Sequence, residues 1–180
     1  MHASLADVIA DTAQNSLEAG ASRVSVDLVE EGAAIAVTIT DNGKGMDAAT
    51  RQRAFEPSCT EAGKHAARKV GLGLPLLKRL CETCGGTCSL DSEPGVGTTL
   101  AYRLDARSRA VPPMGDMAAA VAMLFNFPGD FDLVFTHRRG GKAYSVSRAE
   151  LAAAVGSPET VEGLSLALKF LREQEASAFM

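Results

Sequence analysis

The sequence predicts an α+β protein, in which amphipathic helices and strand hairpins follow one another along the chain. Apolar residues recur at helical spacing in residues 5–18, 72–80 and 161–171, whereas residues 24–39 and 132–146 alternate apolar and polar positions around short turns. The chain has 180 residues, of which 46% are hydrophobic and 22% are charged. This composition is typical of a soluble globular protein and excludes a disordered or collagen-like chain.

The first helix is expected over residues 5–18, and Gly20 supplies its stop signal. Its apolar stripe consists of Leu5, Val8, Ile9, Thr12, Ala13 and Leu17. Asp11 and Asn15 lie off this stripe and four positions apart, so their side chains project from one face of the helix. A carboxylate and an amide therefore share one direction.

A hairpin and a glycine-rich loop are expected next. Residues 24–28 and 35–39 alternate apolar with polar side chains, and Glu30-Glu31-Gly32 between them is typical of a turn. The second strand ends at Asp41, where the loop Asp41-Asn42-Gly43-Lys44-Gly45-Met46 begins. The pattern thus places an acid at a strand terminus beside two glycines.

The following stretch is expected to hold a short helix over residues 47–55 and then a loop. Residues 56–70 show no sustained period and carry several basic residues, which favours a mobile, basic loop. A leucine stripe predicts a helix from about residue 72 to Gly85-Gly86, and two strands are expected over residues 88–91 and 98–104.

A domain boundary is placed near residue 108, because Val111-Pro112-Pro113 breaks the pattern. The chain is thereby divided into residues 1–108 and an α+β extension of residues 109–180. The elements expected in the extension are a helix over 115–125, strands over 132–137 and 142–146, and helices over 148–155 and 158–174. Its amphipathic last helix could cover the sheet or bind a partner.

The chain is expected to lie in the cytoplasm, without a membrane anchor or export signal. Its longest apolar run, residues 117–125, is far shorter than the about 18 residues that span a bilayer. Four cysteines in a chain that can fold without disulfides favour reduced thiols. The net charge of −4 gives no support for a nucleic-acid partner.

The cysteine pattern Cys81-x-x-Cys84-x-x-x-Cys88 leaves more than one interpretation open. Thiolates at such spacing can hold zinc or an iron–sulfur cluster. Cys59, in the expected loop, could be an exposed and oxidisable fourth member. Buried thiols at the end of a helix are the simpler explanation.

Glycine pairs mark three loops, at Gly43/Gly45, Gly71/Gly73 and Gly95/Gly97. Glycine lets a backbone approach a ligand closely, and the first turn of the helix after Gly71 offers unpaired N–H groups to a phosphate chain. A Rossmann interpretation of Gly43-x-Gly45-x-x-Ala48 is disfavoured, because the acid expected about 20 residues further on is missing. A Walker A loop, which needs Gly-Lys-Ser/Thr, is absent from the sequence.

The whole set of motifs, in order, resembles the GHKL superfamily of ATPases: sensor histidine kinases, MutL-type mismatch-repair ATPases, gyrase-type topoisomerases and related heat-shock chaperones. The blocks are Asn15, Asp41-x-Gly43-x-Gly45, Phe55-Glu56-Pro57, Gly71-Leu72-Gly73-Leu74 and Gly97-Thr98-Thr99. They cover residues 5 to 104. The resemblance implies a two-layer sandwich of helices over a mixed, mainly antiparallel sheet.

The resemblance also implies a site for ATP and Mg²⁺. Asn15 matches the asparagine that binds Mg²⁺ through its side-chain oxygen, and Asp41 matches the carboxylate that accepts a hydrogen bond from the adenine amino group. The other residues it assigns to the nucleotide are Gly43, Gly45, Met46, Gly71, Leu72, Gly73, Leu74 and Thr98. The first two glycines and Met46 would lie at the purine, Thr98 near the adenine, and residues 71–73 at the phosphates.

Asp11 is where this sequence departs from the family pattern. Hydrolytic members carry glutamate four residues before the asparagine, as a general base, and aspartate is one methylene shorter. The residue matching that base is thus Asp11, and ATP binding is a safer expectation than turnover.

The function implied is an ATP-binding regulatory protein that phosphorylates a separate protein in trans. His2, His65 and His137 are poor matches to a phospho-accepting histidine. The alternative is an ATP-dependent switch, or slow ATPase, that changes a dimer or partner surface without phosphotransfer.

Overall fold

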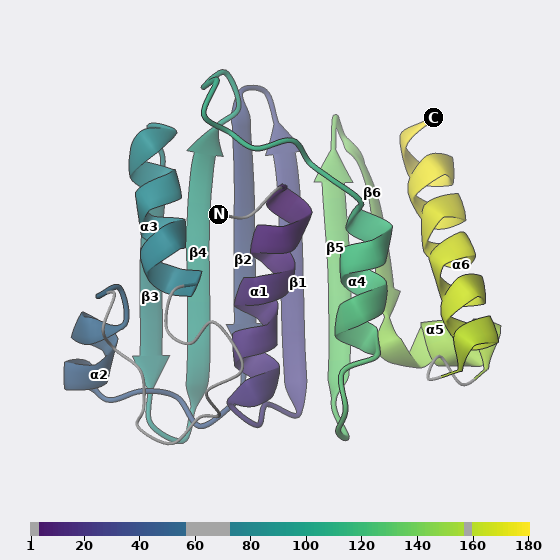
Figure 1. The fold of residues 1–180 in the computed structure, drawn as a ribbon, viewed down its shortest axis with the longest axis horizontal. Helices are drawn as coiled ribbons and strands as arrows, with labels where there is room; N and C mark the ends of the chain where they lie inside the picture. The colour runs from purple at the N-terminus through teal and green to yellow at the C-terminus, as the bar shows by residue number, and fades with distance from the viewer. Residues whose placement is uncertain (1–3, 57–72, 157–159) are drawn as a thin grey trace.

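The computed structural model describes residues 4–56, 73–156 and 160–180. Among them, six strands form one sheet in the order β3-β4-β2-β1-β5-β6, and helices lie over one face of it (Figure 1). Only the β1–β5 pairing is parallel; the other four pairings are antiparallel. The predicted fold class, helices over a mixed and mainly antiparallel sheet, is confirmed.

The first strands form as their alternation predicts. β1(Arg23–Glu31) and β2(Ala34–Asp41) are antiparallel, with Val26 opposite Ile39. Every second side chain of β1, from Val24 to Leu28, is buried on the face that the helices cover. β4(Gly97–Asp105) pairs with β2 on the other side, and β3(Thr87–Glu93) forms one edge of the sheet.

The stretch after residue 108 extends the same sheet. β5(Asp132–Arg139) lies parallel to β1, and β6(Lys142–Ser147) forms the opposite edge. Leu133 and Phe135 of β5 belong to one hydrophobic core that also contains the buried residues of β1 and β2. The division at residue 108 stays a prediction, and the core of the described residues continues across it.

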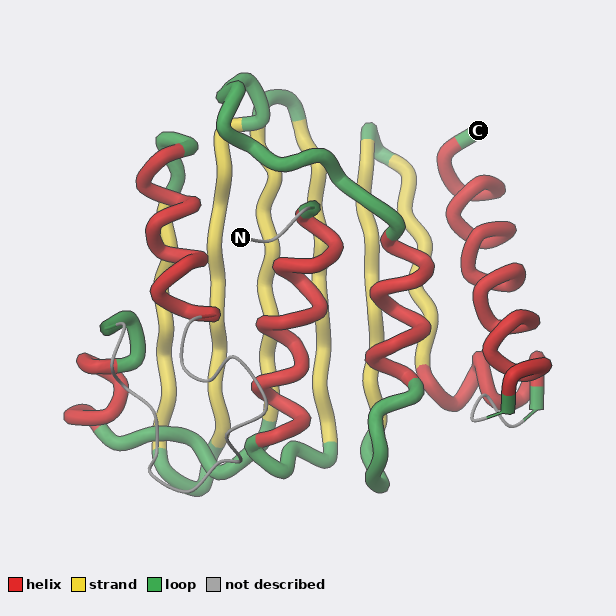
Figure 2. The backbone as a smooth tube through the Cα atoms, viewed as in Figure 1, coloured by secondary structure: helices red, strands yellow, loops and turns green. Residues whose placement is uncertain are grey.

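Helices α1(Leu5–Glu18) and α4(Met117–Phe125) lie side by side over the sheet. Ser4 and Asp7 form a capping box at the start of α1. The loop between β4 and α4 passes over this helix end (Figure 2). There Leu5 N donates a 2.9 Å hydrogen bond to the carbonyl of Pro113, and Ala6 N donates one of 2.9 Å to the carbonyl of Met114. These bonds satisfy N–H groups that have no partner inside the helix.

The remaining helices are α2(Ala48–Arg53), α3(Gly73–Thr83), α5(Arg148–Val155) and α6(Val161–Phe179). The last one continues beyond the predicted end at Gln174. The reason is aromatic packing: the Phe179 ring lies 4.7 Å from the ring of His137, which is 1% exposed and bonded through Nε2 to Glu30 Oε1 at 2.8 Å. His137 is therefore a core side chain.

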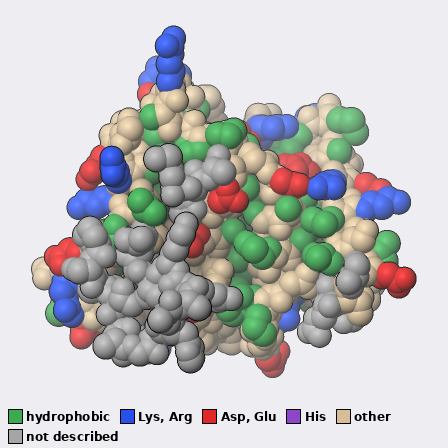
Figure 3. All heavy atoms as spheres, viewed as in Figure 1, with side chains coloured by type: hydrophobic (Ala, Val, Ile, Leu, Met, Phe, Trp, Pro, Cys, Tyr) green, Lys and Arg blue, Asp and Glu red, His purple; other side chains and the backbone are tan. Residues whose placement is uncertain are grey.

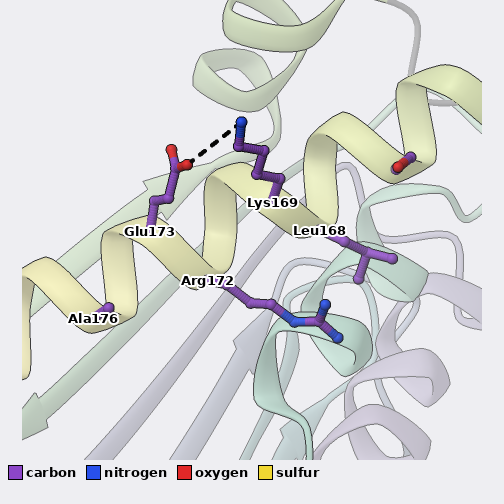
Figure 4. Close-up of a pocket in the computed structure, with 6 residues that line it drawn as sticks. Leu168, Lys169, Arg172, Glu173 and Ala176 are labelled. Atoms are coloured by element: carbon purple, nitrogen blue, oxygen red, sulfur yellow. Dashed lines mark ion pairs between the residues drawn. The ribbon is translucent and has the colours of Figure 1, made fainter.

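A shallow hollow lies along α6, lined by Ser165, Leu168, Lys169, Arg172, Glu173 and Ala176 (Figure 4). Arg172 Nη2 bonds to Asp116 Oδ2 at 2.7 Å and so joins α6 to the start of α4. Hydrophobic side chains gather on the helix face around α4 (Figure 3), where Met123 is half exposed. None of the described helices combines the length and apolar character needed to cross a bilayer.

Candidate nucleotide-binding site

The exposed face of α1 meets the start of α3. Asp11 and Asn15 are exposed on α1, as their spacing predicts. A Cβ atom added to Gly73 would lie 2.6 Å from Asp11 Oδ2 and 3.9 Å from Asn15 Nδ2. The fold thus brings together three of the predicted site residues, and the Asp11 carboxylate would have to shift to admit a side chain at Gly73.

Asp41 ends β2 in a nearly buried position, with 8% of its surface exposed. Its Oδ2 accepts a 2.6 Å hydrogen bond from Ser16 Oγ, and its Oδ1 accepts a 2.8 Å bond from Gly43 N. An ionised carboxylate offers about four acceptor positions, so Asp41 can still accept a bond from a further donor. The carboxylate is thereby oriented by α1 on one side and by the glycine loop on the other.

Two glycines allow the loop after β2 to press against the turn between β3 and β4. Gly45 has φ 63°, and a Cβ there would lie 1.9 Å from the carbonyl oxygen of Glu93. Gly97 has φ 137°, and its Cβ would lie 1.9 Å from the carbonyl oxygen of Asp41. Both close approaches involve rigid backbone, so these positions require glycine.

Ser92 joins the same loop to β4. Its Oγ accepts a 2.8 Å hydrogen bond from Met46 N and lies 2.9 Å from Thr98 Oγ1 and 3.0 Å from the Gly97 carbonyl. Thr98 is the register partner of Asp41 across the β2–β4 pairing. The residues that the sequence assigned to the purine end of a nucleotide therefore meet at one corner of the sheet.

The short helix α2 is fixed beside this corner. Its N-cap Asp47 accepts a 2.7 Å bond from Thr50 N, and this backbone hydrogen bond lowers the pKa of the Asp47 carboxyl. Arg51 Nη1 donates to the carbonyl oxygen of Ser92 at 3.4 Å.

Several predicted site residues are not brought to this corner by the described structure. Gly71 and Leu72 lie outside the described residues, as do Cys59 and residues 57–70 of the expected loop. Leu74 is partly buried and packs against the hydrophobic core. Among the residues that are described, no group of three or more His, Cys, Asp or Glu side chains is placed to hold a metal ion.

Sequence reasoning missed Ser16 and Ser92. Ser16 lies on the buried face of α1, three residues after Ala13, and is itself 5% exposed. A polar residue at a stripe position was a readable signal, because a buried hydroxyl requires a partner. Ser92 carried no comparable signal, since serine is ordinary at the end of a strand before a turn.

Comparison with known proteins identifies a family for more than half of the chain. Residues 2–108 match the family described as histidine kinase-, DNA gyrase B- and HSP90-like ATPase. A sensor protein, IrlS, of Burkholderia pseudomallei (strain K96243) is 33% identical over 89 residues, which are 48% of this chain and 19% of that protein. The sensor histidine kinase AruS of Pseudomonas aeruginosa is 32% identical over 117 residues, 59% of this chain and 12% of that protein.

One solved structure shares the fold over most of the chain. The crystal structure of the N-terminal domain of a DNA repair protein aligns with a TM-score of 0.57 and 13% identity, covering 87% of this chain and 58% of that one. This coverage is larger than the stretch of residues 2–108, so the likeness in fold continues beyond residue 108.

The fold and the motifs define an ATP-binding domain. The chain belongs to the histidine kinase-, DNA gyrase B- and HSP90-like ATPase family. It spans less than a fifth of the two sensor proteins that it matches.

Proposed function

We propose that this chain binds Mg-ATP at the corner between α1, β2 and α3 and transfers the γ-phosphoryl group to a separate protein. The observation that carries this proposal is the arrangement around Asp41: a nearly buried carboxylate with an unused acceptor position, held beside two glycine-rich turns. An adenine amino group is the kind of donor that such a carboxylate accepts, whereas the carbonyl oxygen of guanine would be repelled.

The other end of the site suits a phosphate chain with its ion. Asn15 offers a neutral amide oxygen, the hard ligand type that Mg²⁺ prefers while phosphates supply negative charge. The exposed Asn15 side chain and the neighbouring Asp11 carboxylate fit this ion. We assign Asn15 to the metal, Gly71, Leu72, Gly73 and Leu74 to the phosphates, and Gly43, Gly45, Met46 and Thr98 to the purine. When bound, Mg²⁺ would neutralise phosphate charge.

Asp11 is the candidate base. It lies one helical turn before Asn15 on the same exposed face, and its carboxylate approaches the first residue of α3. A carboxylate in this position could accept the proton of an incoming hydroxyl group.

The proposal is tested by incubating the purified chain with γ-labelled ATP and candidate acceptor proteins. Transfer of label is expected in the native chain and should be lost in Asp11→Ala. Calorimetry should show that Asn15→Ala loses the Mg²⁺-dependent part of ATP affinity and that Asp41→Asn loses the preference for ATP over GTP. Gln14→Ala, between Asp11 and Asn15 on α1, is the matched control and should bind as the native chain does. Unchanged binding in both site variants would overturn the assignment.

A second candidate is an ATP-dependent switch or slow ATPase that binds a partner without phosphotransfer. The aspartate at position 11, shorter than the family's glutamate, favours it. The switch would be supported if the chain binds ATP but labels no acceptor, and if nucleotide changes its oligomeric state or its affinity for a partner.

A further inference from the structure

Two cysteines from facing elements meet under α3. Cys81 lies in the last turns of α3 and is 2% exposed, whereas Cys88 is the second residue of β3 and is half-buried. Both are free thiols. Cys88 packs against the hydrophobic core that contains Cys81.

The backbone holds these two positions toward each other. Cys88 lies opposite Tyr102 of β4, and the Tyr102 side chain is buried beneath the helices, so Cys88 faces the helix layer. α3 covers β3 and β4 on that face (Figure 1). Between the two cysteines the chain reverses tightly, with Gly86 N donating a 2.7 Å bond to the carbonyl of Cys81. A Cβ on Gly86 would lie 1.9 Å from the carbonyl oxygen of Arg103, which fixes this reversal against β4.

The surroundings make the two thiols unequal. The neighbouring Cys81 thiol lowers the pKa of Cys88, and the Lys78 ammonium acts in the same direction. The same contact with Cys88, followed by burial, raises the pKa of Cys81. Cys88 is thus the more exposed of the two thiols and has a lowered pKa, and Cys81 is a buried thiol beside it. This is the environment in which a cysteine reacts with oxidants.

We propose that Cys88 is a site of oxidation by hydrogen peroxide and that Cys81 is its resolving partner. The Cys88 thiolate attacks one peroxide oxygen, the O–O bond breaks, and Cys88 becomes a sulfenic acid while hydroxide leaves and takes up a proton as water. The Cys81 sulfur then attacks the Cys88 sulfur; the S–O bond breaks, and the leaving hydroxide takes the Cys81 proton as a second water. Two thiols are oxidised to one disulfide, and the peroxide is reduced to two waters.

The test uses the full chain carrying Cys59→Ser and Cys84→Ser, so that only the proposed pair remains. After treatment with hydrogen peroxide and alkylation of free thiols, peptide mass spectrometry should find residues 81 and 88 joined, with a mass lower by two hydrogen atoms and restored by dithiothreitol. In the same background, Cys81→Ser should leave Cys88 as a sulfenic acid that dimedone traps. Cys88→Ser should leave Cys81 reduced.

Lys78 provides a second, milder variant in case the cysteine replacements disturb folding. Lys78→Gln should slow the alkylation of Cys88 in the otherwise native chain, and Arg79→Gln, at the exposed neighbouring position, should leave that rate unchanged. The proposal is overturned if Cys88 stays reduced under peroxide, or if its disulfide forms with a second chain in place of Cys81. It is also overturned if, in the native chain, Cys88 forms its disulfide with Cys84.

Discussion

The hydrogen bond between Ser16 and Asp41 gives the sharpest test of how the site is held. In Ser16→Ala the Asp41 carboxylate loses the donor of its 2.6 Å hydrogen bond. Both Ser16 and Asp41 are nearly buried, so water does not readily replace that donor. A hydrogen bond to a charged group contributes about 1.5–3 kcal/mol, and a buried acceptor without its partner is costly. The free energy of unfolding should therefore fall by about 1.5–3 kcal/mol.

The change is measured by urea unfolding, with thermal unfolding as a second probe. In a domain of this size each kcal/mol lowers Tm by roughly 2–4 °C, so a fall of roughly 3–12 °C is expected. ATP affinity should fall as well, because the Asp41 carboxylate would keep its bond from Gly43 N but lose the bond that orients it from α1.

Ser89→Ala is the matched control, since Ser89 is an exposed strand residue. It should change stability by no more than about 0.5 kcal/mol. A double-mutant cycle of Ser16→Ala with Asp41→Asn should show a coupling energy on the order of 1 kcal/mol. The reasoning fails if Ser16→Ala loses no more stability than the control, or if the two changes are additive.

Three further outcomes are expected, each measured by urea unfolding. Gly45→Ala should lower the free energy of unfolding by more than the about 1–2 kcal/mol that a positive φ costs a residue with a side chain, because its Cβ would also clash with a backbone oxygen. Gly95→Ala is the control, since Gly95 has a positive φ but open space around it, and it should show the cost of the positive φ alone. The Ala119 backbone N–H and then Arg172 lower the pKa of Asp116, so the charged form of Asp116 stabilises the fold above about pH 4. This contribution should disappear as the pH falls through the lowered pKa. In Asp116→Asn the free energy of unfolding should therefore fall less steeply with decreasing pH in this range. His137→Ala should cost about 2–4 kcal/mol, since it opens a cavity among aromatic rings; a loss below 1 kcal/mol would contradict this packing.

Local patterns predicted the elements well where one physical signal dominated. The stripe from Leu5 to Leu17 and the alternation around residues 24–39 correspond to α1, β1 and β2. The predicted helix over residues 148–155 has the same bounds as α5, because Ser147 and Glu150 cap it. Asp41 could be placed at a strand end, but the sequence could not show that its carboxylate would be oriented by Ser16.

Long-range pairing could not be predicted in the same way. Alternation in residues 132–137 indicates a strand but does not show which strand it pairs with, because the backbone groups that form the hydrogen bonds are the same in every strand. The position of β5 beside β1 is decided by tertiary packing of residues such as Phe135 in the shared core. The extension of α6 to Phe179 has a similar cause, since the ring contacts that support it come from β5 and β6.

The β1–β5 pairing has a practical consequence for anyone who wishes to produce the family-matched part alone. A chain cut after residue 108 would keep the pairing of β1 with β2 but would leave the backbone N–H and C=O groups that β1 directs toward β5 without a partner strand. It would also uncover the apolar flank of α1 that α4 shields. Such a fragment would expose an unpaired strand edge with which other copies of the fragment could pair, so the expressed chain should extend at least through β6.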